Sequence, residues 1–166
     1  HMYRNPIVQK NIATLKSLGY EFVSPSSGRL ACGDIGEGKL ADVNTIVDYI
    51  VRGVAKKDME GKKLIVTAGP TQEAIDPVRF ITNHSTGKMG YAIAERAALR
   101  GADVTLVSGP VSLNPPSGVK VVNIKSAEDM FNAVTSEYET ADIVIKAAAV
   151  ADYRPAKVSG EKIKKE

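Results

Sequence analysis

The stretch from Leu64 to Gly90, LIVTAGPTQEAIDPVRFITNHSTGKMG, decides the fold of this chain. It opens with residues 64–67, a run rich in β-branched side chains that is typical of a strand buried on both faces of a parallel sheet. A glycine and a proline end this strand, and a polar loop follows it. Residues 91–100, YAIAERAALR, then predict an alanine-rich helix that ends at Gly101.

The order of strand, polar loop and helix start predicts free backbone N–H groups that can hold a phosphate. Ser85, Thr86 and Lys88 add side-chain donors to this cradle, and Gly87 and Gly90 lie beside them. The segment is neither a Walker A motif nor GxGxxG, so the pattern alone leaves a second interpretation open. In that interpretation it is a capped helix start whose glycines allow close packing.

The rest of the sequence predicts helices and strands in alternation around this stretch. Expected helices cover residues 6–18, 43–55 and 126–138, and expected strands cover residues 20–23, 102–108, 119–124 and 142–145. Residues 24–40 hold four glycines without either period and are typical of a mobile flap. Residues 64–166 therefore predict an α/β fold, a Rossmann-like three-layer sandwich with a mainly parallel sheet. A helical segment, residues 1–56, precedes it, with residues 57–63 as the expected linker.

In open parallel sheets ligands collect at the carboxyl ends of the strands. Three loops of this chain follow expected strands, at residues 69–71, 108–110 and 147–152. We expect these loops to meet at one site.

Composition limits the classes of partner. The 166 residues carry a net charge of +3, with acids and bases interspersed, which suits phosphorylated small molecules better than nucleic acid. The sequence holds no apolar run near the roughly 20 residues that span a bilayer, so no membrane partner is expected. The single cysteine excludes an internal disulfide and fits a reducing cytoplasm, the expected location.

Four short motifs occur in this order along the chain: residues 69–71 (GPT), 76–79 (DPVR), 83–90 (NHSTGKMG) and 148–155 (AAVADYRP). Together they resemble phosphopantothenoylcysteine synthetase, the second half of the bifunctional coenzyme A biosynthesis flavoprotein. The resemblance implies a ligase that joins 4′-phosphopantothenate to L-cysteine with CTP and Mg²⁺, through an acyl-cytidylate. It also implies a homo-oligomer, with synthetase dimers and a larger assembly at full length. The preference for CTP over ATP and the identity of the metal stay open.

The resemblance also implies roles for single residues. Lys162 matches the lysine associated with forming the acyl-cytidylate, and Asn83 matches an asparagine that contacts this intermediate. Nucleotide contacts are implied at Lys146, Ala147, Ala148 and Asp152, the last through the ribose or Mg²⁺, and in the cradle at Gly69, Pro70, Thr71, Ser85, Thr86, Gly87 and Lys88. Arg79 is expected either to clamp a phosphopantothenate anion or to pair with Asp76.

The first 56 residues carry a second resemblance, through Asn5-Pro6 and residues 31–39, ACGDIGEGK. These words look like the end of phosphopantothenoylcysteine decarboxylase, an FMN enzyme. The resemblance implies that the glycine-rich flap folds over substrate and that Cys32 donates the proton after decarboxylation. Lys39 departs from the arginine that the family often has there.

The sequence contains the end of one family pattern and the beginning of the other. It lacks the FMN-binding strands of the decarboxylase and the last strands of the synthetase. We therefore expect no decarboxylase activity, and weak or no ligase activity, from these 166 residues alone. Two alternatives are a Rossmann-type nicotinamide-binding oxidoreductase, disfavoured by the missing GxGxxG, and a non-catalytic oligomerisation module.

Overall fold

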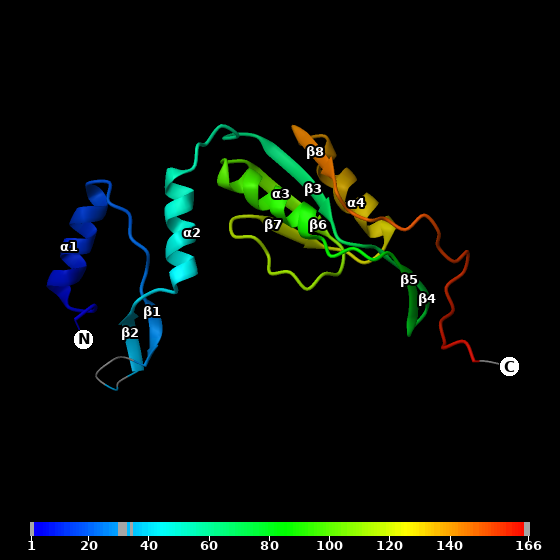
Figure 1. Ribbon diagram of the computed structural model, residues 1–166, viewed down its shortest axis with the longest axis horizontal. Coiled ribbons are helices and arrows are strands. Elements are labelled where there is room, and N and C mark those ends of the chain that lie inside the picture. The colour runs from blue at the N-terminus through cyan, green and yellow to red at the C-terminus, as the bar shows by residue number, and fades with distance from the viewer. Residues whose placement is uncertain (1, 30–32, 34, 165–166) are drawn as a thin grey trace. The chain divides into compact units, whose positions relative to one another are not determined.

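The computed structural model describes residues 2–29, 33 and 35–164 (Figure 1). These residues form two compact units, residues 1–55 and 56–166. No helix in the described part of the chain is long and apolar enough to cross a membrane.

The first unit contains two helices and a short hairpin. Helix α1 covers Pro6–Ser17 and helix α2 covers Val43–Val54. Asn5 caps α1 by accepting a hydrogen bond from the Ile7 N–H at 2.9 Å, and Asp42 caps α2 in the same way. Strands β1 (Ser26–Arg29) and β2 (Ile35–Lys39) pair antiparallel.

Two sequence expectations for this unit are wrong. Residues 20–23 form no strand, and the region expected to lack regular structure holds the β1–β2 hairpin. The hairpin has no apolar alternation because neither of its faces is buried, so its backbone pairing leaves no period in the sequence. Cys32, the expected proton donor, lies outside the described residues.

The second unit is built on a parallel sheet of four strands. These are β3 (Lys63–Ala68), β6 (Asp103–Ser108), β7 (Lys120–Asn123) and β8 (Ile143–Lys146), in the order β7-β6-β3-β8. Leu64, Ile65 and Val66 in the central β3 are at most 2% exposed, which confirms the predicted buried strand.

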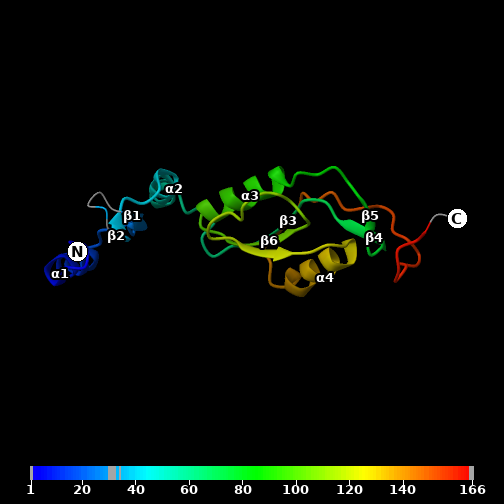
Figure 2. The ribbon, with the colours of Figure 1, turned by 90° about the horizontal axis from the view of Figure 1, so that it is seen from below.

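Two helices cover opposite faces of this sheet, as Figure 2 shows. Helix α3 (Lys88–Leu99) packs Tyr91, Ala94 and Ala97 on the face that carries Leu64 and Val66. Helix α4 (Ala127–Tyr138) packs Met130 on the face that carries Ile65 and Val107. The predicted capping box of α4 is present at Ser126 and Asp129. The expected Rossmann-like three-layer sandwich is confirmed.

One further hairpin lies inside the polar loop of the opening stretch. Strands β4 (Gln72–Asp76) and β5 (Arg79–Thr82) pair antiparallel, and sequence analysis missed both. Their turn is closed by the Asp76 carboxylate, which accepts from the N–H groups of Val78 and Arg79 at 2.9 Å each. β5 is exposed along its length, so it shows no buried apolar pattern.

The expected linker belongs to the second unit. The Met59 N–H donates to the Arg100 carbonyl at 2.9 Å, and the Arg100 guanidinium bonds both oxygens of Asp58. The chain therefore folds back on the end of α3 before it enters β3.

Gly90 sets how closely α3 approaches β3. A methyl group at Gly90 would lie 2.5 Å from the Ala68 Cβ and 2.9 Å from the Thr67 carbonyl oxygen. Gly90→Ala should therefore push α3 off the sheet and lower the free energy of unfolding by about 1–3 kcal/mol, in the range of core overpacking. Urea unfolding followed by NMR signals of β3 measures this.

Gly160→Ala is the control, since a methyl group there meets no atom within 4 Å. It should change the unfolding free energy by less than about 0.5 kcal/mol. Equal stability of the two variants would contradict the proposed contact.

Candidate functional site

The loops after β3 and β8 are joined through their backbones. The Ala149 N–H donates to the Gly69 carbonyl at 2.9 Å, and the Thr71 N–H donates to the Ala149 carbonyl at 3.3 Å. Thr71 is fully buried, and its hydroxyl accepts from the Ala151 N–H at 3.0 Å. The segment that resembles a CTP-binding loop is thus fixed against the start of the opening stretch.

The loop after β6 meets the same place. The Gly109 N–H donates to the Ala68 carbonyl at 2.9 Å, and a methyl group at Gly109 would lie only 1.7 Å from the Pro70 oxygen. Val111 packs against both Gly69 and Gly87, where an added Cβ would lie within 3 Å of its side chain. The three loops expected to meet therefore do meet.

The start of α3 keeps its first N–H groups free of a capping side chain. Gly87 is the N-cap, in the left-handed region at φ 74°, and makes no side-chain cap hydrogen bond. The Ser85 hydroxyl accepts from the Gly87 N–H at 3.3 Å, while Thr86 and Lys88 are exposed. The helix dipole and these amides favour an anion at this position.

Asn83 connects this helix start to the loop after β8. Its amide Nδ2 donates to the Ala149 carbonyl at 3.3 Å and to the Val150 carbonyl at 3.1 Å. Asn83 remains exposed, and its amide oxygen is left to accept from a ligand. The structure thus brings Asn83 together with the loop after β8, in which Asp152 is also exposed; Lys146, the last residue of β8, is exposed as well.

Arg79 pairs with Asp76, which is one of the two alternatives the sequence left open. The guanidinium bonds one carboxylate oxygen through Nε, at 2.9 Å, and through Nη2. The Asp76 side chain is fully buried, whereas the Arg79 side chain is 47% exposed and can still be reached by an anion. The Arg79 guanidinium, helped by backbone N–H groups, holds the pKa of the Asp76 carboxyl well below its usual range.

Lys162 lies beside this pair. The next residue, Ile163, donates its N–H to Asp76 at 3.1 Å and accepts from Arg79 Nη2 at 2.9 Å. Lys162 itself is exposed. Among the described residues, no hydrogen bond or ion pair joins Lys162 to Asn83 or Asp152.

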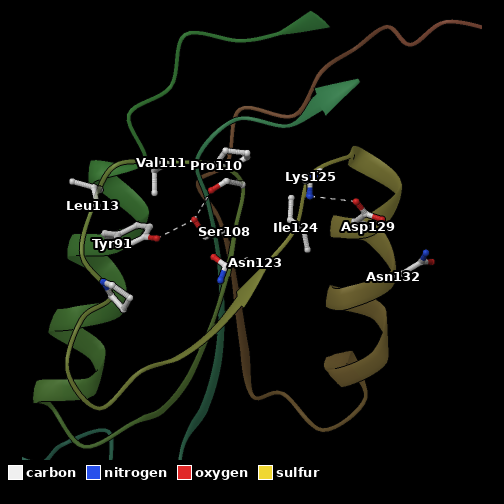
Figure 3. Close-up of a pocket in the computed structure, with 12 residues that line it drawn as sticks. Tyr91, Ser108, Pro110, Val111, Leu113, Asn123, Ile124, Lys125, Asp129 and Asn132 are labelled. Atoms are coloured by element: carbon white, nitrogen blue, oxygen red, sulfur yellow. Dashed lines mark hydrogen bonds between the residues drawn. The ribbon is translucent and has the colours of Figure 1, made fainter. Parts of the chain in front are cut away.

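A cavity of about 590 Å³ opens near the carboxyl ends of β6 and β7 (Figure 3). Of the expected loops, only residues 108–110 line it. The Tyr91 hydroxyl donates to Ser108 Oγ at 3.2 Å, and Asn123 and Asn132 add amides. Sequence analysis missed Tyr91, Asn123 and Asn132. The only sequence signal for these three residues is their position, at the end of an expected strand for Asn123 and on expected helices for Tyr91 and Asn132.

The described residues contain no cluster of three or more acidic, histidine or cysteine side chains able to hold a metal ion. Mg²⁺ is usually held by one or two carboxylates together with phosphate oxygens of a ligand. Asp152 is the exposed carboxylate in the loop after β8 that can take this part.

Fold and loops define an α/β protein with a candidate anion site at the strand ends, and comparison with known proteins narrows this class. The family described as "DNA/pantothenate metabolism flavoprotein C-terminal domain" matches residues 59–166, and the family "Flavoprotein" matches residues 1–55. The chain belongs to the DNA/pantothenate metabolism flavoprotein family.

Relatives in this family are identical to this chain at about half of the aligned positions. Proteins of Bacillus subtilis strain 168 and Vibrio vulnificus strain YJ016, both named coenzyme A biosynthesis bifunctional protein CoaBC, are 52% and 51% identical over 170 and 164 residues. The matches cover 100% and 99% of this chain but 42% and 41% of those proteins. The chain thus spans about two fifths of the length of these curated relatives.

Solved structures show the same fold. The crystal structure of a CoaBC C-terminal domain is 54% identical, with a TM-score of 0.60, over 66% of this chain and 58% of that one. A DNA/pantothenate metabolism flavoprotein from Streptococcus pneumoniae is 35% identical, with a TM-score of 0.53, over 57% and 42%.

The charge on Asp76 predicts a pH-dependent contribution to stability. Because its folded-state pKa lies below the ordinary 3.8, the ionised carboxylate stabilises the fold above that pH, and the contribution is lost as the pH falls further. Asp76→Asn should therefore unfold at lower urea than the unmodified chain from pH 7 to about 5, and the difference should shrink below about pH 4.

Urea midpoints measured from pH 7 to pH 2.5 test this. The matched control is Asp58→Asn, which breaks the exposed Asp58–Arg100 pair. Because exposed pairs contribute little to stability, its midpoint should stay close to that of the unmodified chain. A difference for Asp76→Asn that is constant down to pH 2.5 would contradict the assignment.

Proposed function

We propose that residues 56–166 take part in the CTP-dependent ligation of 4′-phosphopantothenate with L-cysteine in coenzyme A biosynthesis. The observation that carries this proposal is the bonding of Asn83 to the loop after β8, beside a helix start with no capping side chain. Relatives named for coenzyme A biosynthesis support it. We also propose a cytoplasmic location and a homo-oligomer.

The reaction has two steps that both gather anions. A pantothenate carboxylate oxygen attacks the α-phosphorus of CTP, the bond to the β-phosphate oxygen breaks, and pyrophosphate leaves. The cysteine amine then attacks the acyl carbon, the acyl–oxygen bond breaks, CMP leaves, and the amine loses a proton. Catalysis of such steps depends on oriented N–H donors and cations.

Residues of this chain can supply those donors and cations. The free N–H groups at the start of α3, with Lys88, bind phosphate oxygens. The Lys162 ammonium neutralises charge on the triphosphate as pyrophosphate leaves. Asn83, held by its Nδ2, presents its amide oxygen to the acyl-cytidylate. Arg79 meets an anion of phosphopantothenate with its exposed edge.

Nucleotide contacts come from the loop after β8. Backbone groups of Lys146, at the end of β8, and of Ala147 and Ala148 contact CTP in this proposal. Asp152 holds the ribose or a Mg²⁺ ion, which would supply charge neutralisation on the phosphates when bound.

The first unit belongs to the second proposed activity, an FMN-dependent decarboxylation of phosphopantothenoylcysteine. The family "Flavoprotein" at residues 1–55 supports a flavin in that half. In this proposal the β1–β2 hairpin carries a substrate flap, and Cys32 is its proton donor. We assign no flavin contact to the described residues of this unit.

Nucleotide binding gives the first test. Calorimetric titration of the full-length natural protein with CTP, ATP and NADH, each with Mg²⁺, should show CTP binding most tightly. A preference for NADH would favour the oxidoreductase alternative, and no binding of any nucleotide would contradict both.

The assay for Lys162 is phosphopantothenate-dependent release of pyrophosphate from CTP. Lys162→Ala should lower its kcat at least tenfold, because the triphosphate loses a neutralising charge. The matched control is Lys157→Ala, an exposed lysine in the same irregular segment after β8. Its kcat should stay within about twofold of the unmodified protein. Equal losses in both variants would indicate a general charge effect and contradict a specific role of Lys162.

A further inference from the structure

Asp76 is a buried carboxylate that neither step of the proposed reaction uses. Its side chain is fully buried, at the turn of the β4–β5 hairpin. It accepts hydrogen bonds from the backbone N–H groups of Val78, Arg79 and Ile163 and from the Arg79 guanidinium. Two of these backbone donors close the turn, but the third comes from a segment 87 residues further along the chain.

That third donor is part of a two-sided attachment. The Ile163 peptide is held through its N–H by Asp76, at 3.1 Å, and through its carbonyl by Arg79 Nη2, at 2.9 Å. A further bond runs from the Ser159 N–H to the Ile75 carbonyl, at 3.0 Å. Residues 159–163 have no helix or strand of their own, so these three bonds to the hairpin fix their course.

We propose that Asp76 is a positioning residue that holds Lys162 for the formation of the acyl-cytidylate. The proposal rests on the role of Lys162 in the proposed function. Asp76 acts directly on the Ile163 N–H and indirectly by orienting Arg79 toward the Ile163 carbonyl. Because the N–H and the carbonyl of Ile163 are both bonded, the adjoining backbone of Lys162 is fixed. Only the Lys162 side chain then remains to be ordered when CTP binds.

Preorganisation is the physical reason for such an anchor. A lysine on an irregular segment without such bonds would have to lose backbone freedom in each catalytic cycle, and this loss would oppose the transition state. A carboxylate suits the position because every group around it is a donor. An asparagine offers one acceptor oxygen and turns an N–H₂ group toward other donors.

Asp76 also closes the hairpin turn, so a test must separate positioning from a merely structural role. Ile163→Pro contributes to this separation, since it removes the N–H donor of residue 163 and leaves the turn bonds of Asp76 intact. Its ring also restricts the backbone of Lys162, so its effect is interpreted together with that of Asp76→Asn. Ile163→Val is its conservative counterpart, because it keeps the N–H group and shortens the side chain. Ile163 is 49% exposed, so neither change alters the core.

The first measurement is amide hydrogen exchange, which does not depend on activity. In Asp76→Asn the Ile163 amide should exchange at least tenfold faster than in the unmodified protein. In Asp58→Asn, which breaks an aspartate–arginine pair far from this segment in the chain, it should exchange at the same rate. Unchanged exchange in Asp76→Asn would overturn the anchor.

The second measurement is phosphopantothenate-dependent pyrophosphate release from CTP by the full-length natural protein. Asp76→Asn should lower kcat at least tenfold with the KM for CTP within about twofold, and Ile163→Pro should fall at least tenfold below Ile163→Val. Neither Asp76→Asn nor Ile163→Pro should lower the residual rate of Lys162→Ala further, since they act through Lys162. Asp58→Asn should stay within about twofold.

The outcomes separate the two proposals. Equal kcat in Ile163→Pro and Ile163→Val, or additive losses with Lys162→Ala, would overturn the positioning role while the ligase function stands. Absence of pyrophosphate release from the unmodified protein would overturn the ligase function, and with it the role of Lys162. The exchange result would then still decide whether Asp76 holds the segment.

Discussion

Burial of β3 on both faces is the constraint on which the candidate site depends. β3 pairs with β6 along one edge and β8 along the other, and α3 and α4 cover its two faces. No residue of such a strand can shift without disturbing four neighbours. The loops that leave β3, β6 and β8 therefore start from fixed points, and backbone hydrogen bonds between Gly69, Ala149 and Thr71 carry this order into the site.

Sequence alone predicted the parts of the fold that follow from burial and capping. The run 64–67 identified β3, and Ser126 with Asp129 identified the start of α4. Both are local patterns, a buried β-branched run and a capping box, which neighbouring residues determine without distant contacts. The β4–β5 hairpin escaped because its order comes from polar contacts. Asp76 closes its turn and the Thr82 hydroxyl donates to the Thr71 carbonyl at 2.7 Å, neither of which leaves a hydrophobic period.

The candidate site was predicted in the same uneven way. Asn83 was singled out by the family resemblance alone. Ala148 was singled out by the resemblance and by the rule for parallel sheets, which places residues 147–152 at the strand ends. The contact of Ile163 with Asp76 spans 87 residues between two irregular segments, and no local pattern encodes it. The spacing of Asp76 and Arg79, three residues apart, predicted their ion pair as one alternative. Nothing in the sequence indicated that Ile163 would be the third partner.

The same ion pair limits how Arg79 can meet a substrate anion. Its Nε and Nη2 donate to Asp76, and Nη2 also donates to the Ile163 carbonyl, so Nη1 is the nitrogen that these contacts leave for another partner. A bidentate clamp through Nε would leave the buried Asp76 charge without its main partner beside an incoming anion, an arrangement that costs more than the clamp returns. A single contact through Nη1 keeps both Asp76 and Ile163 in place. For the proposed contact of Arg79 with phosphopantothenate, the geometry therefore favours a single hydrogen-bonding point, which keeps the anchor of the Lys162 segment intact.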